Sequence, residues 1–309
     1  MVKKFQVYFT KICDTMRINM MENNKKTDES TTQDPEKKSF FKIIVHSFFI
    51  IPFLIAVFCV LLFAGMHLLT REQRTAYDYL EDVKTGGATK RWQGAFELSK
   101  VLANSRFQPS DDRLLSELIK AFENAKNDDP RVRQYLALAM GRTGRGEFVA
   151  PLIKGLKDET EANIPSLIYA LGMIGDQKAV ATLHEYANHA DSRIRSITTV
   201  ALGNIASPES KNILKNHLKD LEPNVQWGAA ISLARMGDAS GKAILTQMLD
   251  RKYWRDFEEV DSDERTNLML TAISSGALLN DADLNKKIQI LAKNDTNMKI
   301  RATALEVLK

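Results

Sequence analysis

Residues 131–250 repeat one short unit four times, and this repetition constrains the fold more than any other feature of the sequence. Each copy ends in a run of small residues, and the last of them recurs every 31 positions, at Gly144, Gly175, Ala206 and Gly237. A fixed period of this length is typical of a solenoid, in which units that cannot bury their own apolar face stack on copies of themselves. The repetition therefore predicts a stack of similar units.

Each unit has the pattern of two consecutive helices. Asp129-Pro130 suits a helix start, because Asp faces the positive end of the helix dipole and Pro lacks only an N–H group that would be unpaired there. Apolar residues at helical spacing follow over residues 132–140, and the glycine-rich run stops this helix. A second apolar stripe begins near Pro151, which falls in a first helical turn, where proline is tolerated. The unit is predicted to be a helix pair.

The starts of these units resemble the short HEAT-like repeats of the phycobilisome-lyase type. The resemblance rests on Asp129–Arg133, Asp191–Arg195 and Asn297–Arg301, which lead into runs similar to Ala-Leu-Gly-x-x-Gly, and it covers roughly Thr89 to Lys309. It implies an all-α fold, a HEAT-like α-solenoid of about six helix pairs, with the second helix of each pair on the concave face. Because this repeat family includes enzymes, adaptors and scaffolds, the resemblance specifies the fold and leaves the function open.

A long apolar segment precedes the repeats. Ile43 to Leu69 comprises 27 residues without Asp, Glu, Lys or Arg. As one helix it would extend about 40 Å, more than the ~30 Å thickness of the hydrocarbon core of a bilayer. We therefore predict one transmembrane helix within residues 40–70, kinked near Pro52, which serves as a signal anchor because no small-residue cleavage site follows it.

The charges that flank this segment predict its orientation. More basic residues precede the segment than follow it. Five lysines come before it, at Lys25, Lys26, Lys37, Lys38 and Lys42, and three basic residues come after it, at Arg71, Arg74 and Lys84. This bias favours a cytoplasmic N-terminus and repeats outside. Arg71 and Arg74 lie directly after the segment, so the opposite orientation stays open.

The rest of the chain divides into three parts. Residues 1–39 are polar and are predicted to be disordered or partly amphipathic, and either Met1 or Met20/Met21 is the true start. Residues 71–127 are predicted to form a membrane-proximal helix and capping helices, one of them capped by Ser110. Residues 128–309 are the HEAT-like repeats.

An insertion interrupts the repeat after Gly237, since the next equivalent glycine, Gly276, lies 39 positions later. Insertions in solenoids fall on one face and often bind partners. The candidate partner-binding residues are the aromatic and acidic side chains of this insertion: Tyr253, Trp254, Phe257, Glu258 and Glu259. The alternative is a longer linker whose aromatic side chains pack on the neighbouring helix.

Catalytic and metal-binding patterns are sparse. Iron-binding HEAT-like enzymes, the deoxyhypusine hydroxylases, use several His-Glu pairs, whereas this chain has only His184-Glu185. We predict no cofactor, no metal and no catalytic residues. Residues 71–309 carry 34 Lys and Arg against 33 Asp and Glu, which does not favour nucleic-acid binding, because phosphate neutralisation requires concentrated basic charge.

Four polar residues occupy equivalent or nearby positions in their units: Arg133, Arg195, Gln226 and Arg301. We expect them to form a structural ladder that pairs with the acidic helix starts of adjacent repeats, and the alternative is contact with a partner. The sequence as a whole predicts a membrane-anchored scaffold or adaptor whose concave face binds a protein partner, such as a membrane or envelope complex, with its oligomeric state open. The alternative is a lyase- or isomerase-type enzyme or an accessory subunit of an enzyme complex.

Overall fold

The computed structural model describes residues 49–70, 74–109, 111–157 and 159–309. Over these ranges the chain forms α-helices and short 3-10 turns, with no strand. It divides into two units, Met1–Gln73 and Arg74–Lys309. The predicted all-α class is therefore confirmed for the described residues. The predictions for residues 1–39 lie outside them.

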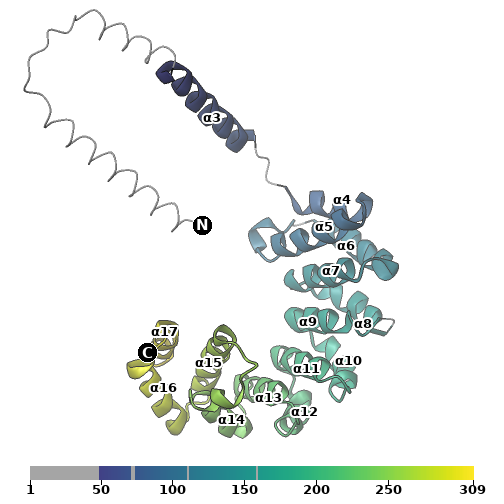
Figure 1. The fold of residues 1–309 in the computed structure, drawn as a ribbon. Helices are drawn as coiled ribbons and strands as arrows, with labels where there is room; N and C mark the ends of the chain where they lie inside the picture. The colour runs from purple at the N-terminus through teal and green to yellow at the C-terminus, as the bar shows by residue number, and fades with distance from the viewer. Residues whose placement is uncertain (1–48, 71–73, 110, 158) are drawn as a thin grey trace, which may run out of the picture. The chain divides into compact units, whose positions relative to one another are not determined.

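The described part of the first unit is helix α3 (Ile51–Thr70) (Figure 1). Its large apolar side chains are exposed, among them Phe53 at 67% and Phe58 at 64%. Within the described residues, no helix has the length and apolar character that a membrane crossing requires. The predicted transmembrane helix over Ile43–Leu69 is therefore not confirmed, and residues 43–48 lie outside the description. Two π-helical residues, Phe49 and Ile50, precede α3. The predicted kink near Pro52 stays a prediction, because the residues before Phe49 lie outside the described ones.

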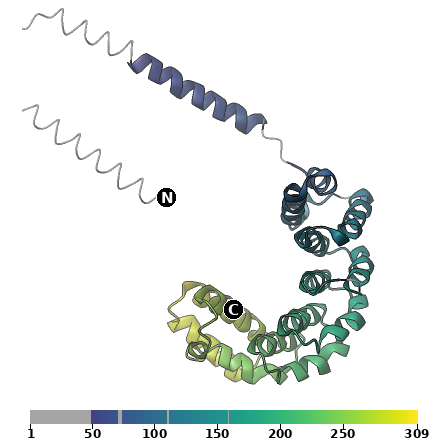
Figure 2. The same cartoon turned by 45° about the vertical axis from the view of Figure 1, so that its right-hand side comes forward.

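The second unit is a stack of fourteen α-helices over its described residues. They are α4 (Ala76–Thr85), α5 (Ala88–Val101), α6 (Asp112–Asn124), α7 (Pro130–Arg142), α8 (Val149–Lys157), α9 (Ile164–Ile174), α10 (Val180–Tyr186), α11 (Ser192–Ile205), α12 (Lys211–His217), α13 (Pro223–Arg235), α14 (Lys242–Met248), α15 (Ser262–Ala277), α16 (Ala282–Asn294) and α17 (Met298–Val307). The stack curves, as Figures 1 and 2 both show. The predicted solenoid is confirmed.

The helices form an inner row and an outer row. Helices α7, α9, α11, α13 and α15 line the concave side, and α8, α10, α12 and α14 lie on the convex side (Figure 1). The prediction that the second helix of each unit lines the concave face is thus wrong, because α7, the first helix of its unit, lies inside. Close packing along the inner row explains the curvature: α7, α9 and α11 contact one another directly, with Gly141 against Ala170 and Gly172 against Ala201. Small residues let the inner helices approach closely.

The apolar core runs between the two rows. Leu136 and Met140 of α7 and Leu152 of α8 are fully buried, as the helical spacing predicts. Towards the C-terminus a second cluster centres on Trp227 of α13 and continues to α17. At the other end, the predicted cap at Ser110 lies outside the described residues, and the side chain of Asp111 caps α6 by accepting a hydrogen bond from the Leu114 N–H group.

The 31-residue period marks a specific backbone conformation. Gly144, Gly175, Ala206 and Gly237 all have positive φ, from 56° to 75°. Each follows an inner helix and turns the chain towards the next outer one. An L-residue in this region brings its Cβ atom too close to the following carbonyl oxygen, which glycine avoids. Of these four residues, only Ala206 has a Cβ atom and therefore makes this close contact with the carbonyl oxygen.

Replacing Ala206 with glycine should therefore stabilise the protein. We expect the free energy of unfolding to rise by about 0.5–1 kcal/mol, since relief of the left-handed strain exceeds the entropy that glycine adds to the unfolded chain. Urea denaturation of Ala206→Gly measures the change. Gly175→Ala is the matched reverse: no atom lies within 4 Å of the Cβ position at φ 75°, so its loss of stability would report backbone strain alone.

Candidate interaction face of the solenoid

One face of each inner helix in the central repeats is turned away from the core. In α7 this face consists of Arg131, Tyr135, Leu138 and Arg142, whose spacing of four, three and four places them in one stripe. The 31-residue period carries the stripe into the next three repeats. We call the resulting sixteen positions the inner face: Arg131, Tyr135, Leu138, Arg142, Ala162, Ser166, Tyr169, Met173, Arg193, Ile197, Val200, Asn204, Asn224, Gly228, Ile231 and Arg235.

The centre of the inner face is apolar and partly exposed. Tyr169 is 39% exposed, Leu138 and Val200 are half-buried, and Ile231 is 8% exposed. These four occupy equivalent positions in successive repeats and so form one row. A row of this kind is uncommon on a surface without function, because contiguous exposed apolar area usually marks a binding site.

The row continues towards the N-terminus with aromatic side chains. The ring of Phe96 on α5 meets that of Tyr135 edge to face, with 5.1 Å between centroids. The guanidinium of Arg131 lies 4.4 Å from the ring centroid of Trp92. Trp92 and Phe96 also line a cleft of about 460 Å³ between α4 and α5. The end of the inner face that lies towards the N-terminus therefore carries aromatic side chains, a type of residue that often anchors protein partners.

Four of the inner helices carry charge of one sign. Helices α7, α9, α11 and α13 contain six arginines and no Asp, Glu or Lys. Four of these arginines are on the inner face. Arg131 and Arg193, at the N-terminal edge, form ion pairs of 2.6 Å with the helix-capping Asp129 and Asp191. These contacts lower the pKa of both carboxyl groups to about 2, chiefly through the side-chain hydrogen bonds from arginine.

The two arginines at the opposite edge contact neutral groups. Nη1 of Arg142 donates to the Ser99 carbonyl oxygen over 2.8 Å, and Nη1 of Arg235 donates to Oδ1 of Asn204 over 3.3 Å. Among the described residues neither forms an ion pair with a carboxylate. This edge of the inner face is therefore positively charged.

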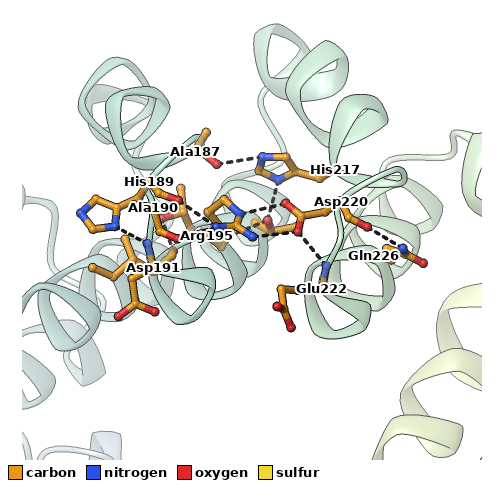
Figure 3. Close-up of polar contacts among 12 residues, drawn as sticks. Ala187, His189, Ala190, Asp191, Arg195, His217, Asp220, Glu222 and Gln226 are labelled. Atoms are coloured by element: carbon orange, nitrogen blue, oxygen red, sulfur yellow. Dashed lines mark hydrogen bonds and ion pairs between the residues drawn. The ribbon is translucent and has the colours of Figure 1, made fainter. Parts of the chain in front are cut away.

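Two arginines of the polar ladder, Arg133 and Arg195, tie their repeats to adjacent ones, and Figure 3 shows the junction at Arg195. Arg195 donates from Nη1 to the carbonyl oxygens of His189 and Ala190, both at 2.9 Å, and from Nε and Nη2 to the Asp220 carboxylate at 2.8 and 2.9 Å. These hydrogen bonds hold the pKa of Asp220 below its usual value. Arg133 likewise pairs with Glu159 and donates to the Phe122 carbonyl oxygen. The predicted pairing with acids of adjacent repeats is confirmed for both arginines.

The other two members of the ladder behave differently. Gln226 donates to the Asp220 carbonyl oxygen over 2.6 Å, and Arg301 donates to the Asp295 carbonyl oxygen over 2.6 Å. The acidic pairing predicted for them is wrong, and each instead ties the loop that precedes its own helix. All four contacts serve the structure of the stack.

His217 lies inside this junction, 4% exposed. Its Nδ1 is 2.6 Å from Oγ1 of Thr199 and its Nε2 is 3.0 Å from the Ala187 carbonyl oxygen (Figure 3). Burial lowers the pKa of the imidazole, outweighing the Ala187 contact and the nearby Asp220, which raise it. The folded protein therefore favours neutral His217.

This shift predicts a pH dependence of stability. As pH falls below about 6.5, the unfolded chain binds a proton at His217 before the folded chain does, so the free energy of unfolding decreases. The contribution is complete above that pH and is lost as pH falls towards the folded-state pKa. Chemical denaturation between neutral pH and pH ~5 should show the decline, and His217→Gln should flatten it. An equal slope in wild type and variant would assign the effect to other groups.

The insertion after α14 packs inward. Trp254 is 2% exposed and its indole N–H donates to the Met248 carbonyl oxygen over 2.9 Å. The Tyr253 hydroxyl accepts a hydrogen bond of 2.9 Å from Trp227 Nε1, and the Phe257 ring lies 5.0 Å from that of Trp227. Trp254 is therefore not accessible to a partner in the predicted way, because almost all of its side chain is buried in the core.

The acidic residues of the same predicted site, Glu258 and Glu259, are exposed. The aromatic side chains thus follow the alternative prediction, packing on the neighbouring helix α13, while the two acids remain accessible. Elsewhere, His184 Nε2 lies 3.0 Å from Ser210 Oγ of the next repeat. The described residues contain no group of three or more His, Cys, Asp or Glu that could hold a metal ion.

The concave side was the predicted partner-binding surface, but the sixteen positions of the inner face were not predicted from the sequence. The 31-residue period could have revealed it, because the positions of Leu138, Tyr169, Val200 and Ile231 follow the same spacing as the turn residues. What the sequence did not reveal was which helix of each pair faces the concave side.

Comparisons with known proteins bear on the same repeats. Two overlapping segments, residues 115–202 and 180–260, match the family described as HEAT repeats. The HEAT-like part of the resemblance stated from the sequence is thereby confirmed. A comparison with curated proteins found no match.

Two solved structures are similar to this chain. One is the complex of CpcE and CpcF of phycocyanin lyase from Nostoc sp. PCC7120, with a TM-score of 0.57 and 17% identity, covering 77% of this chain and 88% of that one. The other is an engineered protein with a TM-score of 0.37 and 17% identity, covering 75% and 95%. At this identity the first likeness shows the fold alone, and the second TM-score is too low to carry an argument.

Proposed function

We propose that this protein is a non-enzymatic scaffold that binds a protein partner on the inner face of its HEAT repeats. The observation that carries the proposal is the row of apolar side chains at equivalent positions of four repeats, in which Tyr169 is exposed, Leu138 and Val200 are half-buried and Ile231 is buried. It lies on rigid helices held by the polar ladder. Partly buried apolar centres with polar edges are typical of protein interfaces.

A second part of the proposal concerns location. We propose that the apolar segment at residues 43–69 holds the chain at a membrane, with the N-terminus in the cytoplasm and the repeats outside. Support comes from the absence of charged residues over these 27 positions and from the exposed apolar side chains of α3. Alkaline extraction of membranes and a reporter fused after Lys309 would test anchoring and orientation separately. Full release into the aqueous fraction would refute the anchor.

Site-specific photo-cross-linking tests the scaffold. A photoreactive amino acid at Tyr169 of the full-length chain should join covalently to a discrete protein in native cells. The matched control is Asn212 of α12, an exposed position on the outer row. Equal capture at both positions, or capture at Asn212 alone, would refute the inner face as the binding surface.

The enzymatic alternative is a lyase- or isomerase-type activity, or an accessory role in such a complex. It draws on the fold likeness to the phycocyanin lyase complex. A chromophore bound to the purified full-length chain would give visible absorbance that protein alone lacks. Such absorbance, with no partner cross-linked at position 169, would favour the enzyme over the scaffold.

A further inference from the structure

The inner face combines two features that together select a class of partner. Its centre is apolar, and helices α7, α9, α11 and α13 carry arginine as their only charged residue type. A partner that brought basic side chains to this face would meet like charge, which costs affinity and slows association. A neutral partner would leave the arginines at the positive edge without counter-charges.

We propose that the inner face binds an extended, acidic protein segment that carries an apolar side chain at every third position. This inference rests on the proposed scaffold function and deepens it. It names the chemistry of the partner: aliphatic or aromatic side chains for the apolar row, and carboxylates for Arg142 and Arg235.

The spacing of the repeats supports an extended segment. Inner helices packed through glycine lie about 8–10 Å apart, whereas an extended or polyproline chain advances about 3.1–3.3 Å per residue. Three residues of such a segment therefore span one repeat. Side chains at every third position would meet Leu138, Tyr169 and Val200 in turn, whereas Ile231 is buried. A helical segment, advancing about 1.5 Å per residue, would need six residues per repeat and would match this row less directly.

The arginines supply the complementary charge. Arg142 and Arg235 lie at the same edge of the inner face, three repeats apart, so they bracket a segment of about ten residues. In each, the hydrogen bonds to described residues come from Nη1. Guanidinium presents five N–H donors, so Nε and Nη2 add donors that suit a carboxylate. Arg131 and Arg193 contribute less, because Asp129 and Asp191 already bind them.

Titration with designed peptides tests the proposal. The protein is the full-length chain in detergent micelles. The probe is a synthetic peptide of about ten residues with leucine at every third position and glutamate elsewhere, and its control has lysine in place of glutamate. We expect the glutamate peptide to bind at least about ten-fold more tightly than the lysine peptide, and to weaken as salt rises.

Charge reversal locates the site. Arg142→Glu with Arg235→Glu should weaken binding of the glutamate peptide by about ten-fold or more. Lys157→Glu with Lys211→Glu makes the same change in net charge on the outer helices α8 and α12, and should alter the affinity by less than about two-fold, as expected for remote charges. Tyr169→Ala should weaken binding of the glutamate peptide. It should also reduce the loss of affinity that follows when the leucine side chains of the peptide are removed. Thermal melts of each variant confirm that the fold persists.

Three results would overturn the inference: equal binding of the two peptides, equal losses in the two double variants, or tighter binding of single-stranded oligothymidine than of the glutamate peptide at the same salt. Cross-linking of a cellular protein at Tyr169 together with failure of the glutamate peptide would leave the scaffold standing and refute the acidic partner. Failure of both would refute both.

Discussion

Replacing Gly172 with alanine is expected to lower the free energy of unfolding by about 2 kcal/mol or more, although alanine favours helices over glycine. A Cβ atom at this position would lie 2.7 Å from both Cα and Cβ of Ala201 on the neighbouring inner helix. Because one of these atoms is backbone, α9 and α11 would have to separate. Urea denaturation of Gly172→Ala gives the change directly.

Gly228 provides the matched control. It also lies within an inner helix, but its Cβ position is 3.5 Å from Cγ2 of Thr199, an ordinary contact. Gly228→Ala should therefore raise stability by up to about 1 kcal/mol, which is the difference in helix propensity. If Gly172→Ala were as well tolerated as Gly228→Ala, close approach of the inner helices would not explain the curvature of the stack.

Replacing Arg133 with methionine is expected to destabilise the protein by about 3–5 kcal/mol, the usual effect of removing one partner of a buried ion pair. The side chains of Arg133 and Glu159 are 5% and 3% exposed. Without the guanidinium, the Glu159 carboxylate would stay buried with two neutral donors, the Asn163 amide at 2.8 Å and the Thr160 N–H group at 3.4 Å. The Phe122 carbonyl oxygen would lose its 2.7 Å bond. Thermal and urea unfolding both measure the loss.

Two further variants separate charge burial from loss of packing. Adding Glu159→Gln to Arg133→Met removes the unpaired charge and should recover part of the stability. Arg131→Met, two positions away, breaks an exposed pair with Asp129 and should barely change the melting temperature. A double variant no more stable than Arg133→Met would show that the buried charge is not the cause.

The predictable part of the fold is local. The spacing of Gly144, Gly175, Ala206 and Gly237 reports a left-handed turn, which depends on the chain's own sterics, and the helix starts at Asp129 and Asp191 report capping within three residues. Such signals act over a few residues and are therefore visible in one unit. The role of Arg133 and Arg195 in the polar ladder could also be predicted, because the two residues recur at equivalent positions of their units.

The remaining features depend on contacts between units. Tyr253, Trp254 and Phe257 look like an exposed cluster in the sequence, but in the structure all three rings pack on Trp227 of α13, which buries Trp254 and covers part of the other two. The acids beside them, Glu258 and Glu259, have no such neighbour and stay exposed. Whether an aromatic residue in an insertion faces solvent is decided by what the next helix presents.

The sequence by itself determined that this chain is built of stacked helix pairs, where each pair turns, and which residues cap its helices, because these follow from backbone sterics and from apolar spacing within one unit. Only the tertiary structure decided which helix of each pair faces inward, because that depends on how closely glycines of one repeat approach the backbone of the next. The inner face, with its apolar row and its arginine edge, exists only once that choice is made.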